Sequence, residues 1–255
     1  MALDYNNNAS HSLISNLSSP AAVDYHYELG YMFWSDTRER NIKRSNMDGT
    51  NITVIQVIGD CYGLAVEWNS MQLYWTDVRN RSISVSDLEG NNRRVFNCSI
   101  SDYPIGIVLD PHEGVMFWTE WKSTASNFSK VMKSTLDGTH CATLVASKFF
   151  TFAGITLDRR SKLVFWLEYG RSVVESVDYS GNNRRVVLNY LPHSSLRGVT
   201  FASSYLFVSS LRGNLHKVHA SNGSVIRRFV IDPRVSHGLV AFDSSLQSPG
   251  LLSSK

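Results

Sequence analysis

The sequence predicts an all-β fold, a propeller of six four-stranded blades, on the basis of three observations. An aromatic block recurs around Trp34, Trp75, Trp118 and Trp166, at intervals of 41, 43 and 48 residues. A glycine followed by an apolar run precedes each later block, and a turn containing glycine follows it. Repeats of about 40 to 50 residues that each supply four short strands are typical of propeller blades.

Each repeat gives four strands in a fixed order. Gly63-Leu-Ala-Val-Glu67 is apolar nearly throughout, as in a strand buried on both faces. Gln72-Leu-Tyr-Trp-Thr-Asp77 is rich in residues that suit a pleated surface and forms the second strand. A loosely alternating third strand at 82–86 and a Leu88-Glu-Gly90 turn then lead into the fourth. Because no segment has helical periodicity, helical-repeat and βαβ folds are excluded.

The repeats predict a single domain over residues 1–255. Five blades are expected at about 21–59, 62–103, 105–150, 153–193 and 197–234. The fifth is degenerate, because Val208 replaces the tryptophan and Ser210 replaces the acid. The sixth blade is expected to be split between the termini (238–255 with 1–18), with its fourth strand near 12–16, and to be incomplete.

Composition and cysteine usage narrow the class of protein. The net charge of +3 is too small to indicate a nucleic-acid partner. There is no apolar run long enough for a membrane span, and residues 1–8 lack the features of a signal peptide. The spacing of Cys61, Cys98 and Cys141 is not that of a metal site. It favours three separate thiols, with one disulfide left open.

Seven Asn-x-Ser/Thr sites favour a glycosylated, extracellular protein and are the candidates for N-glycosylation. They are Asn8, Asn16, Asn51, Asn80, Asn97, Asn127 and Asn222.

At its aromatic blocks the chain resembles the Tyr-Trp-Thr-Asp, or class B, repeats of the low-density-lipoprotein receptor family. Leu73-Tyr-Trp-Thr-Asp77 matches the motif, and Phe33-Trp-Ser-Asp36, Phe117-Trp-Thr-Glu120 and Phe165-Trp-Leu-Glu168 are conservative variants. The resemblance covers nearly the whole chain. It implies a six-bladed propeller like those of endocytic lipoprotein receptors, Wnt co-receptors and the matrix protein nidogen.

We interpret the motif residues as structural, because a packing solution is repeated in every blade whereas a functional site seldom is. The tryptophans are expected to fill the space between blades, and the acids to hold neighbouring loop backbone. The set is Trp34, Asp36, Trp75, Asp77, Trp118, Glu120, Trp166 and Glu168.

Ligand binding is expected where the repeats differ, on the loops after second strands and before first strands, which emerge on one face. This face is the usual ligand-binding one in the family. Its basic and aromatic residues form the predicted rim: Arg38, Arg40, Tyr62, Arg79, Arg81, Tyr103, Trp121, Lys122, Phe150, Phe152, Tyr169, Arg171, Arg197 and Arg212. Trp121 is the preferred residue, as an aromatic expected at a loop tip. His193 and His237 are candidates for pH sensing, in line with acid-dependent ligand release in endocytic members.

The favoured function is a non-enzymatic, extracellular ligand-binding propeller, related to lipoprotein receptors, that binds protein ligands and no cofactor or metal. The alternatives are a propeller like that of a Wnt co-receptor or a nidogen-like, matrix-binding propeller. A metal-dependent propeller hydrolase is the enzymatic alternative. It is disfavoured because the expected inner strands, such as Ile107-Val-Leu109, are apolar. The expected location is extracellular, or the ectodomain of a single-pass receptor.

Overall fold

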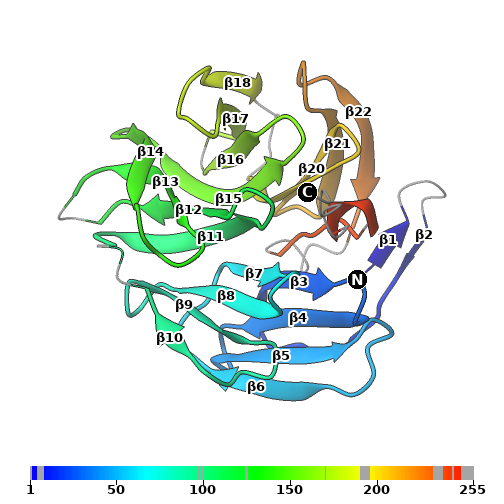
Figure 1. Cartoon of the computed structure of the whole chain (residues 1–255). Helices are drawn as coiled ribbons and strands as arrows, with labels where there is room; N and C mark the ends of the chain where they lie inside the picture. The colour runs from blue at the N-terminus through cyan, green and yellow to red at the C-terminus, as the bar shows by residue number, and fades with distance from the viewer. Residues whose placement is uncertain are drawn as a thin grey trace, which may run out of the picture.

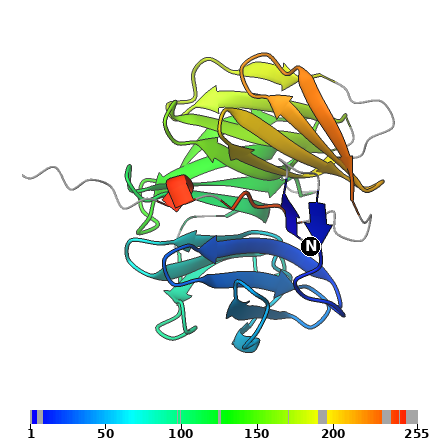
Figure 2. The same ribbon diagram turned by 90° about the vertical axis from the view of Figure 1, so that its right-hand side faces the viewer.

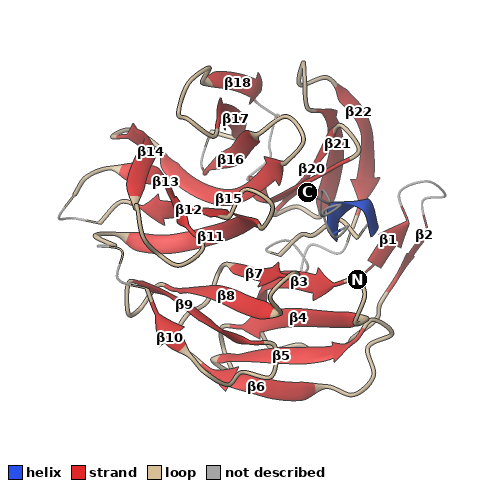
Figure 3. Ribbon diagram, viewed as in Figure 1, coloured by secondary structure: helices blue, strands red, loops and turns tan. Residues whose placement is uncertain are grey.

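A computed structural model describes residues 2–4, 9–96, 98, 100–123, 126–169, 171–189, 196–231, 238–242 and 244–247. Five four-stranded antiparallel sheets surround a common axis as propeller blades (Figure 1). Apart from one short 3₁₀ helix, η2 (Ser244–Gln247), the regular elements are strands (Figure 3). Among these residues, no helix is long and apolar enough to cross a bilayer.

The blades follow one another along the chain, each with its first strand nearest the axis (Figure 1). Blade one consists of β3 (Pro20–His26), β4 (Tyr31–Asp36), β5 (Asn41–Asn46) and β6 (Thr53–Val57). Blade two consists of β7 (Leu64–Glu67), β8 (Gln72–Asp77), β9 (Ser82–Asp87) and β10 (Arg94–Val95). Blade three consists of β11 (Tyr103–Asp110), β12 (Val115–Trp121), β13 (Ser129–Thr135) and β14 (Ala142–Ser147).

Blades four and five repeat the same order. Blade four consists of β15 (Thr151–Asp158), β16 (Leu163–Tyr169), β17 (Val173–Asp178) and β18 (Arg185–Leu188). Blade five consists of β19 (Leu196–Ala202), β20 (Tyr205–Ser210), β21 (Asn214–His219) and β22 (Val225–Val230). The aromatic blocks are the second strands, as the sequence predicts.

The hydrophobic core is divided into wedges between neighbouring blades. Trp75 packs with Phe33 and Leu64 between blades one and two, and Trp118 packs with Tyr74 between blades two and three. Trp166 packs with Phe117 between blades three and four. Trp75, Trp118 and Trp166 are completely buried. The motif tryptophans therefore bind one blade to the blade before it.

The hydroxyl group of the motif Ser or Thr links successive blades near the axis. Thr119 Oγ1 accepts a hydrogen bond from Gly106 N (3.1 Å) in its own blade and donates to Ala153 O (2.6 Å) in the next. Thr76 repeats this between Gly63 N and Ile105 O, and Ser35 between Ala22 N and Cys61 O. Leu167 occupies the same position in blade four and has no hydroxyl group.

Glycine at the start of the inner strand lets neighbouring backbones approach closely. A Cβ atom at Gly63 would lie 2.2 Å from Ile105 O in the next blade, closer than real Cβ atoms come. A Cβ atom at Gly238 would lie 3.0 Å from Ala21 O in blade one. Residues 238–242 thus pack on blade one much as each inner strand packs on the blade that follows it.

The predicted sixth blade is not seen as a four-stranded sheet. Residues 238–242 lie in the place of its inner strand, where Ala241 N donates to Thr200 Oγ1 (3.1 Å) and Gln247 bonds to the backbone of Tyr25 and Tyr27. β1 (Ala2–Asp4) and β2 (Ala9–His11) form a separate hairpin. This hairpin lies between β22 and blade one (Figures 1 and 2). The expected strand at 12–16 is wrong; the strand is formed by 9–11 instead.

The prediction of three separate thiols is also wrong. Cys98 and Cys141 form a disulfide with their Cα atoms 6.0 Å apart. Cys98 follows the outer strand of blade two, and Cys141 precedes the outer strand of blade three, so the bond joins neighbouring blades at their periphery. Cys61 is free and buried, and burial raises the pKa of its thiol to about 12.

Candidate ligand-binding rim and central channel

The predicted rim residues with described positions lie at one end of the blades. The start of each first strand pairs with the end of its second strand, as in Tyr103 with Trp121 and Thr151 with Tyr169. Turns between second and third strands place Arg38, Arg40, Arg79, Arg171 and Arg212 on the surface. Arg81 lies over the ring of Tyr103 (4.9 Å). His193 and His237 lie outside the described residues.

Blades three to five bring six rim residues together, which we call the aromatic–basic patch: Trp121, Phe149, Phe150, Tyr169, Arg171 and Arg197. Trp121 and Tyr169 have ring centroids 6.1 Å apart, and the guanidinium of Arg197 lies 5.0 Å from the Tyr169 ring. Arg171 lies 4.3 Å from the Phe150 ring. The patch alternates aromatic and cationic groups across two blade boundaries.

Phe149 belongs to this patch although the rim prediction omits it. Its side chain is 80% exposed beside Phe150, the largest exposure of any described aromatic side chain. The two consecutive Phe residues before an inner strand could have indicated this, because successive side chains of an extended segment point in opposite directions and only one of the two points inward. An exposed phenyl ring beside a second ring that an arginine covers is typical of a binding surface.

Two rim predictions need correction. Phe152 is completely buried against Trp166, because β15 begins at Thr151 and directs this side chain into the wedge between blades. Trp121 is the last residue of β12 and is half-buried, not an exposed aromatic at a loop tip. Its indole Nε1 is buried and donates no hydrogen bond to any described residue.

A network around Asp102 holds the loop after Trp121. The buried Asp102 carboxylate accepts hydrogen bonds from Ser123 N (2.9 Å) and Ser126 Oγ (2.6 Å) and pairs with Lys130 (2.8 Å). Burial would raise the pKa of Asp102, but these bonds from Lys130, Ser126 and Ser123 outweigh it and leave the pKa well below its usual range. The loop beside the patch is therefore fixed by a charged anchor.

The four motif acids make two kinds of contact. Asp36 accepts backbone N–H groups from both flanking loops, including those of Ser18 and Glu39, and Asp77 accepts the N–H of Asn80. The longer Glu120 instead accepts the indole N–H of Trp118 (2.9 Å). Glu168 pairs with Arg171 (3.1 Å) and lies 3.9 Å from Arg184. The acids hold the second strand and its following turn, and Glu168 also holds a patch arginine.

Five of the glycosylation candidates can be placed. Asn16, Asn51, Asn80, Asn127 and Asn222 are all exposed. Asn8 and Asn97 lie outside the described residues.

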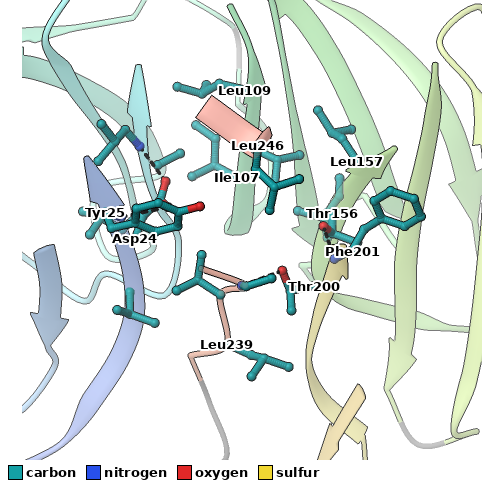
Figure 4. Close-up of a pocket in the computed structure, with 18 of the residues that line it drawn as sticks. Asp24, Tyr25, Ile107, Leu109, Thr156, Leu157, Thr200, Phe201, Leu239 and Leu246 are labelled. Atoms are coloured by element: carbon teal, nitrogen blue, oxygen red, sulfur yellow. Dashed lines mark hydrogen bonds between the residues drawn. The ribbon is translucent and has the colours of Figure 1, made fainter. Parts of the chain in front are cut away.

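A cavity of about 120 Å³ lies on the central axis and is lined by the inner strands of all five blades and by the 239–247 segment (Figure 4). Most of the residues that line it have apolar side chains, among them Ile107, Leu109, Leu157, Leu239 and Leu246, although polar atoms make up the larger part of its exposed wall (Figure 4). Thr156 and Thr200 accept backbone N–H groups from the next segment around the axis, those of Phe201 and Ala241. The channel is thus closed by packing and short hydrogen bonds.

Asp24 is the charged exception among the inner-strand residues facing this channel (Figure 4). Its carboxylate accepts Val66 N (2.8 Å) from blade two and Tyr25 N (2.9 Å). Burial raises the pKa of Asp24 to about 6, although these hydrogen bonds and the charge of Arg159 lower it. The signal was an aspartate inside an apolar stretch, Ala21-Ala-Val-Asp24.

The raised pKa of Asp24 predicts a pH-dependent stability. The folded state keeps the Asp24 proton up to about pH 6, whereas the unfolded chain loses it near 3.8, so this contribution is present below about pH 4 and is lost as the pH rises through 6. The difference corresponds to about 3 kcal/mol at about 1.36 kcal/mol per pKa unit. Asp24→Asn should therefore gain stability relative to wild type between about pH 4 and pH 7, as measured by urea unfolding. Parallel stability curves for the two proteins would contradict this.

The channel gives little support to metal-dependent catalysis. Among the described residues, no group of three His, Cys, Asp or Glu side chains is arranged to hold a metal ion. Of the charged side chains that line the channel, Asp24 has its hydrogen bonds with backbone, and Arg159 donates both Nε and Nη2 to Leu109 O.

Comparison with known proteins supports the resemblance at one repeat. The family model "Low-density lipoprotein receptor repeat class B" matches residues 72–111, which span β8 to β11. The chain therefore carries a low-density lipoprotein receptor class B repeat within a propeller fold. The resemblance stated from the motif residues is confirmed for this part of the chain.

Curated relatives of the class B propeller include low-density lipoprotein receptor-related protein 5 from Homo sapiens and from Mus musculus. The human protein is 34% identical over 113 residues, and the mouse protein is 30% identical over 111 residues. These matches cover 43% and 42% of the present chain and 7% of either relative. The matched region is thus a small part of a much longer protein.

Solved structures share the fold of the class B propeller. A chain of the nidogen/laminin complex has a TM-score of 0.79 at 23% identity and covers 87% of this chain and 84% of its own. A gluconolactonase from Xanthomonas campestris has a TM-score of 0.74 at 15% identity, covering 87% and 78%. A luciferin-regenerating enzyme has a TM-score of 0.72 at 14% identity, covering 88% and 80%. At these identities the likeness shows the propeller fold alone, which both binding proteins and enzymes use.

Proposed function

We propose that this class B propeller is an extracellular, non-catalytic binding domain, and that a protein partner docks on the aromatic–basic patch of blades three to five. The observation that carries the proposal is the patch itself: guanidinium groups lie over the rings of Phe150 and Tyr169, and the 80%-exposed Phe149 lies beside Phe150. Aromatic and Arg side chains supply most hot spots of protein interfaces. Arginines on this surface favour a partner with acidic side chains.

Two further observations support an extracellular binding role over an enzymatic one. The Cys98–Cys141 disulfide is a bond that persists in oxidising compartments. The channel offers mainly apolar side chains, whereas a hydrolase of the lactonase kind needs oxygen ligands converging on a cation. Laminin appears beside nidogen in the neighbouring structure, and the relatives are receptor-related proteins. A matrix protein and the ligands of such receptors are therefore the partners to test first.

The test is a binding measurement with defined probes. Laminin, a lipoprotein particle and a secreted Wnt-pathway inhibitor are passed over the immobilised propeller, and the affinity of each is recorded. We expect at least one to bind, and Phe149→Ser and Arg171→Ala to weaken that binding by about tenfold or more, since hot-spot truncations cost about 2 kcal/mol or more.

Arg160→Ala is the matched control, because Arg160 is exposed in a turn at the opposite end of β15. It should leave the affinity unchanged, and both Phe149→Ser and Arg160→Ala should unfold at nearly the wild-type temperature. Arg171→Ala removes the closest ion-pair partner of the buried Glu168 and should unfold at a lower temperature, so its affinity is measured where thermal unfolding shows that it is folded. The proposal would be overturned if none of the three probes bound. It would also be overturned if a probe that binds wild type bound both patch variants with unchanged affinity.

A further inference from the structure

A second cavity lies away from the aromatic–basic patch, between blades one and two. Its volume is about 280 Å³, and three of its lining side chains are arginines: Arg40, Arg79 and Arg93. Asp77, Asn80 and the 57–59 segment complete the wall. Arg40 and Arg79 come from turns after second strands, whereas Arg93 precedes β10, so distant parts of two blades contribute arginines to the wall of one cavity.

These arginines have few acidic partners. Arg79 contacts Asp60 at 3.3 Å, and both side chains are partly exposed. Within the described part of the chain, no carboxylate lies at ion-pair distance from Arg40 or Arg93. Asp77 already accepts two hydrogen bonds from Asn80, at 3.0 and 2.8 Å. Three guanidinium groups against two carboxylates leave the cavity with an excess of positive charge.

Blade four contains an arginine equivalent to Arg93 together with an acid that neutralises it. The repeated segments Asn92-Arg-Arg-Val95 and Asn183-Arg-Arg-Val186 place Arg184 in the same position, where it lies over Trp166 as Arg93 lies over Trp75. The residue opposite Trp166 is Glu175, and it binds Arg184 at 2.6 Å.

In blade two the corresponding acid is missing. The residue opposite Trp75 is Ser84, whose hydroxyl lies 3.4 Å from Arg93 Nη2. Blade two thus has the arginine of blade four without its carboxylate, and two more arginines, Arg40 and Arg79, line the same cavity. An anionic group from outside the chain would restore the balance that Glu175 provides in blade four.

We propose that this cavity, the arginine pocket, binds a sulfate or phosphate monoester group of a small ligand. A tetrahedral oxyanion can accept N–H groups from several guanidinium groups at once, which is the contact that Arg makes best. The volume admits the oxyanion with part of the molecule that carries it. The inference is independent of protein binding at the aromatic–basic patch.

The test uses glucose 6-sulfate and glucose 6-phosphate as probes, with glucose as the neutral control, at constant ionic strength set with chloride. Because Asn80 lies in the wall and starts an Asn-x-Ser site, the protein is made in a bacterial periplasm, where Asn80 carries no glycan. Calorimetry should show saturable binding of one or both esters and none of glucose. Binding of one ester only identifies which oxyanion the arginine pocket prefers.

Variants locate the site. Arg40→Gln combined with Arg93→Gln should weaken ester binding by about tenfold or more, because two charge-assisted hydrogen-bond donors are lost. Arg38→Gln is the matched control, since Arg38 is exposed in the same turn as Arg40 but does not line the cavity. Ser84→Glu should abolish binding without removing any arginine, by recreating the ion pair of blade four.

Absence of binding by both esters at millimolar concentration would overturn the proposal. So would binding that survives in the folded Arg40→Gln, Arg93→Gln protein, or that Arg38→Gln weakens equally. Ser84 is buried, so its variant counts only when thermal unfolding shows that it is folded; the arginine variants decide the matter otherwise.

Discussion

Trp118→Ala should lower the free energy of unfolding by about 5 kcal/mol or more, the largest effect expected from any single substitution in this chain. Trp118 is completely buried between blades two and three, so truncation leaves a large cavity, at a cost of about 3–5 kcal/mol. Its indole N–H also donates to Glu120, a buried carboxylate that would lose a partner. That loss adds about 1.5–3 kcal/mol.

The matched comparison is Trp166→Ala. Trp166 is equally buried, but its Nε1 has no acceptor among the described residues. Denaturant unfolding should therefore give a smaller loss for Trp166→Ala than for Trp118→Ala, with the difference measuring the bond to Glu120. Equal losses would show that this bond contributes nothing, and a loss under about 1 kcal/mol in either variant would contradict the packing account.

Removing the Cys98–Cys141 disulfide should cost about 4 kcal/mol, the second largest effect. The bond closes a loop between residues 43 apart in sequence, and loop-closure entropy for that length gives about 4 kcal/mol. A Cys98→Ser, Cys141→Ser double variant should unfold at a lower denaturant concentration than wild type.

Adding a reductant distinguishes the effect of losing the disulfide from other effects of the two serine substitutions. It should shift wild type to the midpoint of the double variant and leave the double variant unchanged. Cys61 is buried and already a free thiol, so the reductant does not change it. The shift of the wild-type midpoint therefore reports on the disulfide alone. Wild type that keeps its midpoint after complete reduction would contradict the prediction.

Much of the blade architecture could be predicted because the repeat spacing is carried by large residues that must be buried. The disulfide was missed for a reason visible in the numbers. Cys98 and Cys141 are separated by 43 residues, the same interval as Trp75 and Trp118, so they lie one repeat apart near the outer strands of adjacent blades. Reading the cysteines against the repeat length, and not against metal-site spacings, would have paired them.

The rim was harder to predict because exposure depends on where a strand begins. Phe152 was placed on the rim because the inner strand was expected to begin near Gly154, whereas β15 begins at Thr151. The two clusters, the aromatic–basic patch and the arginine pocket, join blades that are consecutive in the chain, so the repeat order places these blades side by side. The spacing of the repeats does not specify the direction of each side chain at the strand ends.

The hydrogen bonds between inner strands have a consequence for how the ring can change. The boundary between blades two and three and the boundary between blades three and four depend on the hydrogen bond of the motif hydroxyl. At the axis-facing position of the inner strand, these blades have Ala65 and Val108, which cannot form a second side-chain hydrogen bond. Boundary four–five has the opposite arrangement: Leu167 provides no hydroxyl, and Thr156 makes the link to Phe201. Boundary one–two has both links, through Ser35 and Asp24. A hydrogen bond from an axis-facing inner-strand side chain can therefore replace the one that the motif hydroxyl makes. A repeat can lose the Thr of the motif once such a hydrogen bond is present.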